Sequence, residues 1–438
     1  MDKLQTFERL ESQVRGYSRS FPTVFVTARG SLLWDEEGRE YLDFLSGAGT
    51  LNYGHNNPII KKQLIAYLQQ DGLVHGLDMA SSAKKRFLET FEAVILKPRG
   101  LEYKVQFPGP TGTNAVEAAL KLARKVTGRT TVVSFTNGFH GVTLGSVAAT
   151  GNTFFREGAG VSLNHTTFMP YDGYLGEGVD TLEYFRHFLA DPSSGLDQPA
   201  AVIVETVQGE GGVNTASPAW LQGLENLCRE FGILLIADDI QTGCGRTGTF
   251  FSFEEAGIVP DIVTLSKSFG GYGLPLSALL IRPDLDQWKP GEHSGTFRGN
   301  NLALVAAAGA VDHYWQDQVF TLEIGRKSRL LRRRLEALCD RFPEYLSVRG
   351  RGLIQGLVCA APQHARRISQ AAFGRGLVIE TSGSEGQVVK LLPPLVIEES
   401  LLVKGAEILA ESAAVVLGED APDEEDGLLV SQTKEVSR

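Results

Sequence analysis

The sequence of 438 residues has few cysteines, no long hydrophobic run and no apolar signal region at its start. Its cysteines, Cys228, Cys244, Cys339 and Cys359, lie far apart, without the paired spacing of a zinc site or the density of a disulfide scaffold. No apolar run reaches the roughly 18 residues that a membrane helix needs. These absences predict a cytoplasmic protein with no membrane segment and no bound metal.

Positive charge is scarce and scattered. The chain has 42 Lys and Arg against 52 Asp and Glu, so its net charge is −10. The short basic run Arg332-Arg333-Arg334 is typical of a solvated helix face, and we expect no nucleic-acid partner. Glycine, by contrast, is abundant. The 49 glycines concentrate in loops between apolar runs, which indicates an α/β enzyme whose backbone closely approaches a ligand.

Two short apolar runs lead into charged side chains. Residues 233–238 end at Asp238, and residues 261–265 are followed by Ser266 and Lys267. Such runs predict buried strands of a parallel sheet, and ligands of open α/β sheets lie at the carboxyl ends of the strands. A lysine and an acid in one crevice suit pyridoxal phosphate, which needs an amine for a Schiff base and an acid that keeps its ring nitrogen protonated. A buried ion pair, or two unrelated strand ends, is the alternative interpretation.

The rest of the chain alternates between apolar runs and helical patterns, which predicts a mostly parallel sheet with right-handed crossovers. Strands are expected over 131–135, 201–205, 276–281, 350–358, 376–380 and 388–395, the last as far as its prolines. Helices are expected over 1–20, 58–70, 82–96, 115–124, 179–190, 218–231, from 301, and over 319–341. We predict a large domain at 56–318, a smaller α+β domain from 1–55 with 319–418, and a disordered acidic tail at 419–438.

Loops at the element ends supply further candidate contacts. Gly112 and Thr113 precede a strongly helical stretch, where free N–H groups and the helix dipole favour an anion, although many helices start this way and hold nothing. Phe139, next to His140, could stack on a flat ligand or be a core aromatic at a turn.

Carboxylates and a glycine-rich segment are expected around the same crevice. Glu205 and Glu210 flank it at the end of the strand predicted over 201–205. The segment 46–55, which contains Asn52, is too rich in glycine for an element interior and too apolar for a solvent loop. We interpret it both as a tight crossing between domains and as a wall of a substrate pocket.

These pieces follow one another in an order that resembles a class III aminotransferase of fold type I, over roughly residues 5–415. The supporting motifs are the glycine cup at 109–113, aromatic-His-Gly at 139–141, Glu-x4-Glu-Gly-Gly at 205–212, the Asp-Asp-Ile-Gln-Thr-Gly run at 238–248, Ser-Lys at 266–267, Gly-Thr-Phe at 295–297 and Leu-Pro-Pro-Leu at 392–395. The sequence is closer still to the diaminobutyrate–2-oxoglutarate transaminases of ectoine biosynthesis, through segments 17–22, 47–55, 75–79, 108–117 and 295–300.

The resemblance implies a role for each matching residue. Lys267 would be the Schiff-base lysine, which also moves the proton at the reacting carbon, and Asp238 would pair with the ring nitrogen. The other residues that it implies as cofactor contacts are Gly112 and Thr113 for the phosphate, Phe139 and His140 for the ring face, Gln241 for the ring oxygen and Thr296 for the phosphate of a neighbouring subunit. A homodimer or higher oligomer with shared sites would follow.

The resemblance also implies a substrate site formed by Glu210, Lys390 and Asn52. Glu210 resembles a gate carboxylate, which in the wider class pairs with an arginine. Lys390 stands at the arginine position, as it tends to in the diaminobutyrate subgroup, and lysine lacks the two-pronged grip of arginine on a carboxylate. Asn114 likewise replaces the glutamate that is usual in the wider class.

The activity implied is a reversible transamination between L-glutamate and L-aspartate 4-semialdehyde, giving L-2,4-diaminobutyrate and 2-oxoglutarate. Ectoine synthesis is the expected use of the product, with a siderophore or peptide as the alternative. An aminotransferase for ornithine or 4-aminobutyrate is a further alternative. Two further alternatives are an enzyme that uses the same cofactor without transamination and a non-catalytic protein that binds the cofactor.

Overall fold

The computed structural model describes residues 3–418, and the predicted acidic tail lies outside them. Within this range the central sheet has seven strands. In spatial order they are β4 (Lys104–Gln106), β12 (Ala278–Ile281), β11 (Ile262–Leu265), β10 (Leu234–Asp238), β7 (Ala201–Val204), β5 (Val132–Phe135) and β6 (Thr166–Met169). The pairs from β11 to β6 are parallel, and β12 and β4 are antiparallel to their neighbours. The sheet is therefore mostly parallel, as predicted.

Both faces of this sheet are buried, because successive strand residues enter two different apolar clusters. Ile203 and Ile236 pack with the buried face of α6, whereas Val202 and Leu235 belong to the larger cluster on the opposite face. Helices of this half of the molecule are α4 (Pro58–Gln69), α5 (Ser82–Phe91), α6 (Gly112–Thr127), α7 (Leu144–Ala148), α8 (Thr153–Glu157), α9 (Thr181–Ala190), α10 (Pro218–Glu230) and α11 (Asn301–Tyr314). Burial on both faces explains why the central strands β7 and β10 are apolar in sequence up to Asp238.

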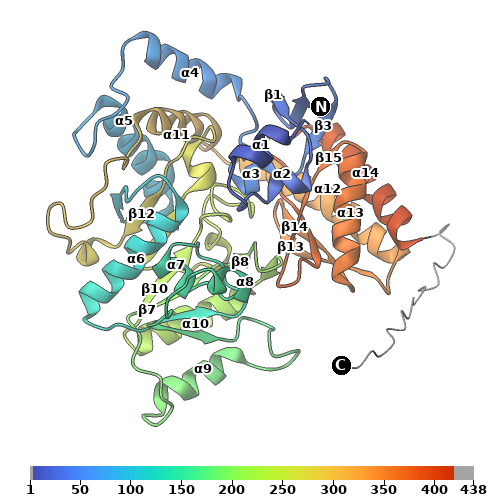
Figure 1. The fold of residues 1–438 in the computed structure, drawn as a ribbon. Coiled ribbons are helices and arrows are strands. Elements are labelled where there is room, and N and C mark those ends of the chain that lie inside the picture. Colours follow the sequence, from blue (N-terminus) through green and yellow to red (C-terminus); the bar gives the residue numbers. More distant parts are fainter. Residues whose placement is uncertain (1–2, 419–438) are drawn as a thin grey trace, which may run out of the picture.

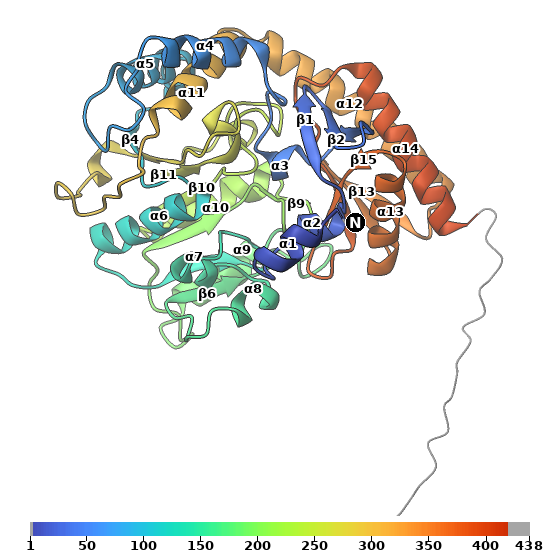
Figure 2. The ribbon, with the colours of Figure 1, turned by 45° about the horizontal axis from the view of Figure 1, so that its top comes forward.

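A second region combines the two ends of the described chain (Figures 1 and 2). One sheet joins β1 (Phe25–Arg29), β2 (Leu32–Asp35) and β3 (Glu40–Asp43) to β15 (Leu377–Val378), and the other runs β13 (Leu346–Arg351), β14 (Ile354–Cys359), β17 (Val388–Leu391) and β16 (Glu380–Ser382). The helices here are α12 (Val319–Arg341), α13 (Pro362–Gly374) and α14 (Glu399–Leu417). The domain boundaries given above stay a prediction, but N- and C-terminal strands do share a sheet.

Several elements differ from the sequence prediction. The single helix expected over 1–20 is two short ones, α1 (Gln5–Leu10) and α2 (Tyr17–Ser20). The strand expected over 350–358 is a hairpin that turns at Gly352, where φ is +59°. Residues 376–380 are divided between β15 and β16, which belong to different sheets. The shorter elements are α3 (Ser46–Gly49), β8 (Val207–Gln208), β9 (Asn214–Thr215) and five helical turns, η1 (Glu92–Leu96), η2 (Lys97–Arg99), η3 (Glu254–Ala256), η4 (Lys267–Gly270) and η5 (Pro283–Leu285).

No helix among residues 3–418 has both the length and the apolar composition needed to cross a membrane.

Candidate active site

A cavity lies at the carboxyl ends of the central parallel strands. Ligands of open α/β sheets bind at this edge. Eight of the residues proposed from the sequence line the cavity: Gly112, Thr113, Phe139, His140, Glu210, Asp238, Gln241 and Lys267. Glu205 lines it as well. Residues that are far apart in the sequence are thus brought to one place.

The register of two neighbouring strands explains why Asp238 and Lys267 line the same cavity. Asp238 is the last residue of β10 and lies opposite Thr264 of β11. Lys267 follows three residues later, where the chain leaves the sheet, and its φ is +50°, in the left-handed region. Non-glycine residues adopt this conformation rarely, and when they do it is often at functional sites. The backbone there turns the lysine toward the cavity.

The amine of Lys267 has a lowered pKa. Burial is the largest cause, and the charge of Lys390 adds to it, while Glu210 opposes it. A lowered pKa increases the fraction of neutral amine, which is the nucleophilic and basic form.

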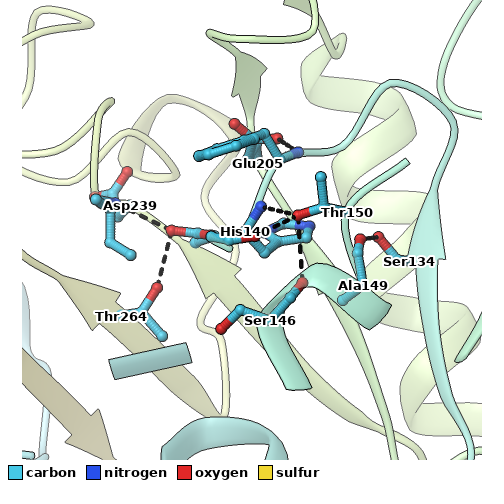
Figure 3. Close-up of polar contacts among 12 residues, drawn as sticks. Ser134, His140, Ser146, Ala149, Thr150, Glu205, Asp239 and Thr264 are labelled. Carbon is cyan, nitrogen blue, oxygen red and sulfur yellow. Dashed lines mark hydrogen bonds and ion pairs between the residues drawn. The ribbon is translucent and has the colours of Figure 1, made fainter. Parts of the chain in front are cut away.

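Asp238 is held from several sides. Its Oδ2 atom lies 2.6 Å from Nδ1 of His140, and its Oδ1 atom accepts a hydrogen bond from Oγ1 of Thr264 at 3.0 Å. Burial alone would lower the pKa of His140, but the hydrogen bond to Asp238 and the negative charges nearby raise it above the ordinary value. Figure 3 shows His140 at the centre of this network, with its backbone N–H bound to Thr150. The carboxylate is therefore fixed in orientation and faces the cavity.

Two further carboxyl groups are buried close to Asp238. Burial raises the pKa of Glu205 to about 7, although the backbone N–H of Phe139 donates to its Oε2 atom at 3.0 Å (Figure 3). Burial also raises the pKa of Asp239 to about 6, against hydrogen bonds from Ser252 and Thr242. Ionising either group in the folded state therefore costs stability.

Replacing Glu205 by glutamine is expected to remove part of the pH dependence of stability. A rise of the pKa from 4.5 to about 7 means that the folded state holds this proton more tightly, so stability falls as the pH rises through that window. The full difference is about 3 kcal/mol. The variant should therefore unfold at a higher temperature than the wild type at pH 8, with a smaller difference in unfolding temperature at pH 5.

The matched control for this prediction is Glu225→Gln, which changes a buried glutamate on α10. An equal gap at both pH values would contradict the prediction.

The N-terminus of α6 forms another wall of the cavity. Thr111 caps this helix together with Asn114, so the amide replacing the expected glutamate serves as a cap. The N–H groups of the first helical turn have no intrahelical acceptor, and Gly112 and Thr113 supply two of them. A side chain at Gly112 would press against Ile240, since a Cβ atom there would lie 3.0 Å from Ile240 Cδ1. The wall is suited to an anion that approaches the backbone closely.

Glu210 lies between the cavity and Lys390. The Nζ atom of Lys390 is 2.7 Å from Oε1 of Glu210, and Nε2 of Gln241 donates to the same oxygen at 3.2 Å. Burial would raise the pKa of Glu210, but Lys390 and Lys267 lower it to about 2. Glu210 is therefore ionised at neutral pH.

Three of the predicted site residues do not line this cavity. Thr296 lines a second cavity with His75 and Phe297. Lys390 lies behind Glu210 and is completely buried. Asn52 is also buried, and its amide donates to the Cys244 carbonyl and accepts from Arg246, so the side chain supports loops instead of facing the cavity.

The groups around the cavity fit a phosphorylated aldehyde with a basic aromatic ring. An amine is provided by Lys267, an oriented carboxylate by Asp238 and an aromatic face by Phe139. The first turn of α6 provides backbone donors for a phosphate. Pyridoxal phosphate has this set of functional groups.

Residues 14–412 match the family model described as Aminotransferase class-III. The chain belongs to the class III aminotransferases. Among its relatives, the diaminobutyrate–2-oxoglutarate transaminase of Bordetella parapertussis is 63% identical, covering 96% of this chain and 97% of that protein. The enzyme of the same description from Virgibacillus pantothenticus is 56% identical, covering 94% of this chain and all of that protein. The family predicted from the motifs is thus confirmed.

Solved structures of aminotransferases share the fold of this class III chain. The ornithine aminotransferase of Toxoplasma gondii, whose structure reports partial occupancy of PLP at its active site, is 27% identical with a TM-score of 0.82, covering 94% of this chain and 93% of that one. An aminotransferase of Bacillus anthracis has a TM-score of 0.83 at 23% identity, covering 93% of this chain and 96% of that one. The predicted α/β architecture of fold type I is confirmed.

Some residues of this aminotransferase site were not found from the sequence. Ile240, which lines the cavity, looks like part of an apolar strand end. Glu380 and Tyr17 contact the Lys390 ion pair from other parts of the chain. Glu380 ends the strand expected over 376–380, which is a weak signal for a site residue, and nothing local in the sequence links Tyr17 to it.

Proposed function

We propose that this aminotransferase transfers the amino group of L-glutamate to L-aspartate 4-semialdehyde, in a reversible reaction that gives 2-oxoglutarate and L-2,4-diaminobutyrate. The observation that carries the proposal is that Lys267, Asp238 and Glu210 line one cavity, with Lys390 paired to Glu210 behind the cavity wall. The substrate choice is supported by relatives at 56–63% identity that are described as diaminobutyrate–2-oxoglutarate transaminases.

The cofactor is pyridoxal phosphate. When bound, it supplies an aldehyde that takes up the amino group and a protonated ring that accepts electrons from the reacting carbon. The residues that would hold it are Gly112 and Thr113 at the phosphate, Phe139 and His140 at the ring face, Asp238 at the ring nitrogen, Gln241 at the ring oxygen and Lys267 at the aldehyde.

Lys267 and Asp238 have separate tasks in the transfer. The Nζ atom of Lys267 removes the proton from the substrate carbon that bears the reacting amino group, which its lowered pKa favours. Asp238 keeps a negative charge at the cavity wall, where His140 and Thr264 fix its two oxygens. A charge already oriented by hydrogen bonds needs no reorganisation during the reaction.

Glu210 and Lys390 bind the end of the substrate that does not react. Glutamate reacts at its α-amino group and brings two carboxylates, whereas diaminobutyrate reacts at its C4 amine and presents an ammonium and a carboxylate at the other end. A carboxylate can pair with Lys390 when Glu210 turns away, and an ammonium can pair with Glu210. The Glu210–Lys390 pair can therefore bind a substrate end of either charge, Lys390 a carboxylate and Glu210 an ammonium.

We further propose a cytoplasmic homodimer or higher oligomer in which Thr296 contacts the phosphate bound by the neighbouring subunit. The position of Thr296 on a separate cavity, away from Lys267, supports this arrangement. Ectoine synthesis is the proposed use of the product.

A coupled assay with purified protein tests the proposed reaction. With diaminobutyrate and 2-oxoglutarate, we expect one glutamate for each diaminobutyrate consumed. We expect kcat/KM for ornithine and for 4-aminobutyrate to be at least about tenfold lower, because ornithine has one more carbon atom between the reacting amine and the charged end, and 4-aminobutyrate lacks the α-ammonium group. A higher kcat/KM for ornithine or 4-aminobutyrate would assign the protein to a different substrate, and consumption of amine without glutamate would exclude transamination.

A further inference from the structure

Lys390 lies between two carboxylates, not one. Its Nζ atom is 2.7 Å from Oε1 of Glu210 and 3.1 Å from Oε1 of Glu380. The Lys390 side chain has 0% exposure, that of Glu380 7% and that of Glu210 27%. A buried ammonium requires a counter-ion, but one carboxylate would be enough for that. The second carboxylate leaves the group of three with an excess of negative charge.

The two carboxylates differ in how they are held. Glu380 lies directly opposite Lys390 in the antiparallel pair of β16 and β17, so the sheet fixes their contact. Glu210 comes from the loop after β8 and lines the cavity. Glu380 is therefore the permanent partner of Lys390, and Glu210 is the one that substrate can reach.

Tyr17 supports Glu380 from the N-terminal segment. Its hydroxyl donates to Oε2 of Glu380 at 2.9 Å. The pKa of Glu380 is raised, mainly by burial and also by the charge of Glu210, while the charge of Lys390 and the hydrogen bond from Tyr17 oppose that rise. These two residues thus favour the ionised form of the buried carboxylate.

The substrates of the proposed reaction carry opposite charges at neutral pH. Diaminobutyrate has two ammonium groups and one carboxylate, and glutamate has one ammonium group and two carboxylates. A single Lys–Glu pair is neutral and favours neither. With Lys390 neutralised by Glu380, the charge of Glu210 remains to attract a cation.

We propose that Glu380 is a specificity-determining residue that neutralises Lys390 and so leaves Glu210 to attract the α-ammonium group of diaminobutyrate. This inference deepens the proposed function and rests on it. Glu380 itself lies behind Lys390 and acts on the substrate through the charge of the pair, with Tyr17 as its positioning residue.

The test is a comparison of both substrates in Glu380→Gln. Removing one negative charge makes the pocket more positive, so KM for diaminobutyrate should rise and KM for glutamate should fall, by up to about tenfold each for a charge at this range. Glutarate, a dianion without an amino group, should inhibit the variant more strongly than the wild type.

Three further variants serve as comparisons. Glu380→Asp retains the charge and should keep the wild-type ratio of the two KM values. Tyr17→Phe should shift both constants in the same directions by a smaller factor. Glu225→Gln, which removes a buried carboxylate elsewhere, should change neither constant.

The outcomes separate this inference from the proposed function. If Glu380→Gln shifts both KM values in the same direction, or neither, Glu380 has no role in specificity even though wild-type turnover of diaminobutyrate stands. If the wild type does not convert diaminobutyrate, the proposed function is wrong. The role of Glu380 is then tested by comparing the KM values for ornithine, as the cationic substrate, and for glutamate in the same variants. If Glu380→Gln fails to fold, an unchanged ratio of KM values in Tyr17→Phe overturns the inference.

Discussion

Lys267→Ala is expected to reduce kcat by more than about 10³-fold and to remove the visible absorption band that the cofactor has when it is linked to the amine. The lysine has two tasks that no other described residue can take over, since it supplies both the amine that holds the aldehyde and the base that moves the proton. Lys390 also carries an amine near the cavity, but it lies behind Glu210 and its pKa is raised by Glu210 and Glu380 against the effect of burial. It therefore stays protonated and paired.

A matched control for Lys267→Ala is Lys327→Met. Lys327 is also buried, with its Nζ atom bound to the carbonyl of Leu395 at 2.9 Å, but it lies outside the cavity. This variant should lose stability and keep its absorption band and most of its turnover. Appreciable turnover by Lys267→Ala, measured without added amines, would refute the catalytic role of Lys267.

The central sheet could be predicted because its strands are encoded locally. The central parallel strands are buried on both faces, so residues 201–204 and 234–237 are continuous apolar runs in the sequence. Their ends mark the cavity edge, which explains why the sequence alone could place Asp238 and Lys267 in one crevice. Thr296 and Lys390 could be predicted as site residues only from the family resemblance. They lie far from Lys267 in the sequence, and no local pattern links them to the same site.

Other features depend on pairing between distant segments and could not be predicted. The left-handed φ of Lys267 is imposed by the chain around it, since lysine does not prefer that conformation. Glu380 meets Lys390 through the register of β16 and β17, which a single sequence does not specify. The short strands β15 and β16 look continuous in sequence, and the chain changes sheets between them.

The wrong prediction of one helix over residues 1–20 has a clear physical reason. The apolar residues recur at helical spacing, but Leu10 is 68% exposed and Val14 90% exposed in the single chain. Most helices in proteins are stabilised by burying an apolar face, and Leu10 and Val14 of this face stay exposed. Tyr17 and Phe21 are the points where the segment is attached to the rest of the chain, through Glu380 and Phe373.

Asp238→Ala is expected to reduce kcat by about 10²- to 10⁴-fold, and Asp238→Asn should be nearly as damaging. Alanine removes the charge and both hydrogen bonds, whereas asparagine keeps the size and an acceptor for Thr264 and removes the charge. The comparison therefore separates the charge from the geometry. If Asp238→Asn retained wild-type kcat, the charge of Asp238 would have no part in catalysis.

A second measurement on Asp238→Asn is the pKa of His140, which does not depend on enzyme activity. Because the hydrogen bond to Asp238 is the largest contribution that raises the pKa of His140, its removal should lower that pKa, with burial then dominating. A titration of the histidine ring signals by NMR, with His140→Gln to assign the signal, measures the change. Asp239→Asn is the matched control, since Asp239 is also buried at the end of β10 but binds Thr242 and Ser252. It should leave the pKa of His140 raised and retain most of the activity. An unchanged His140 pKa in Asp238→Asn would show that the two side chains are not coupled as the 2.6 Å contact implies.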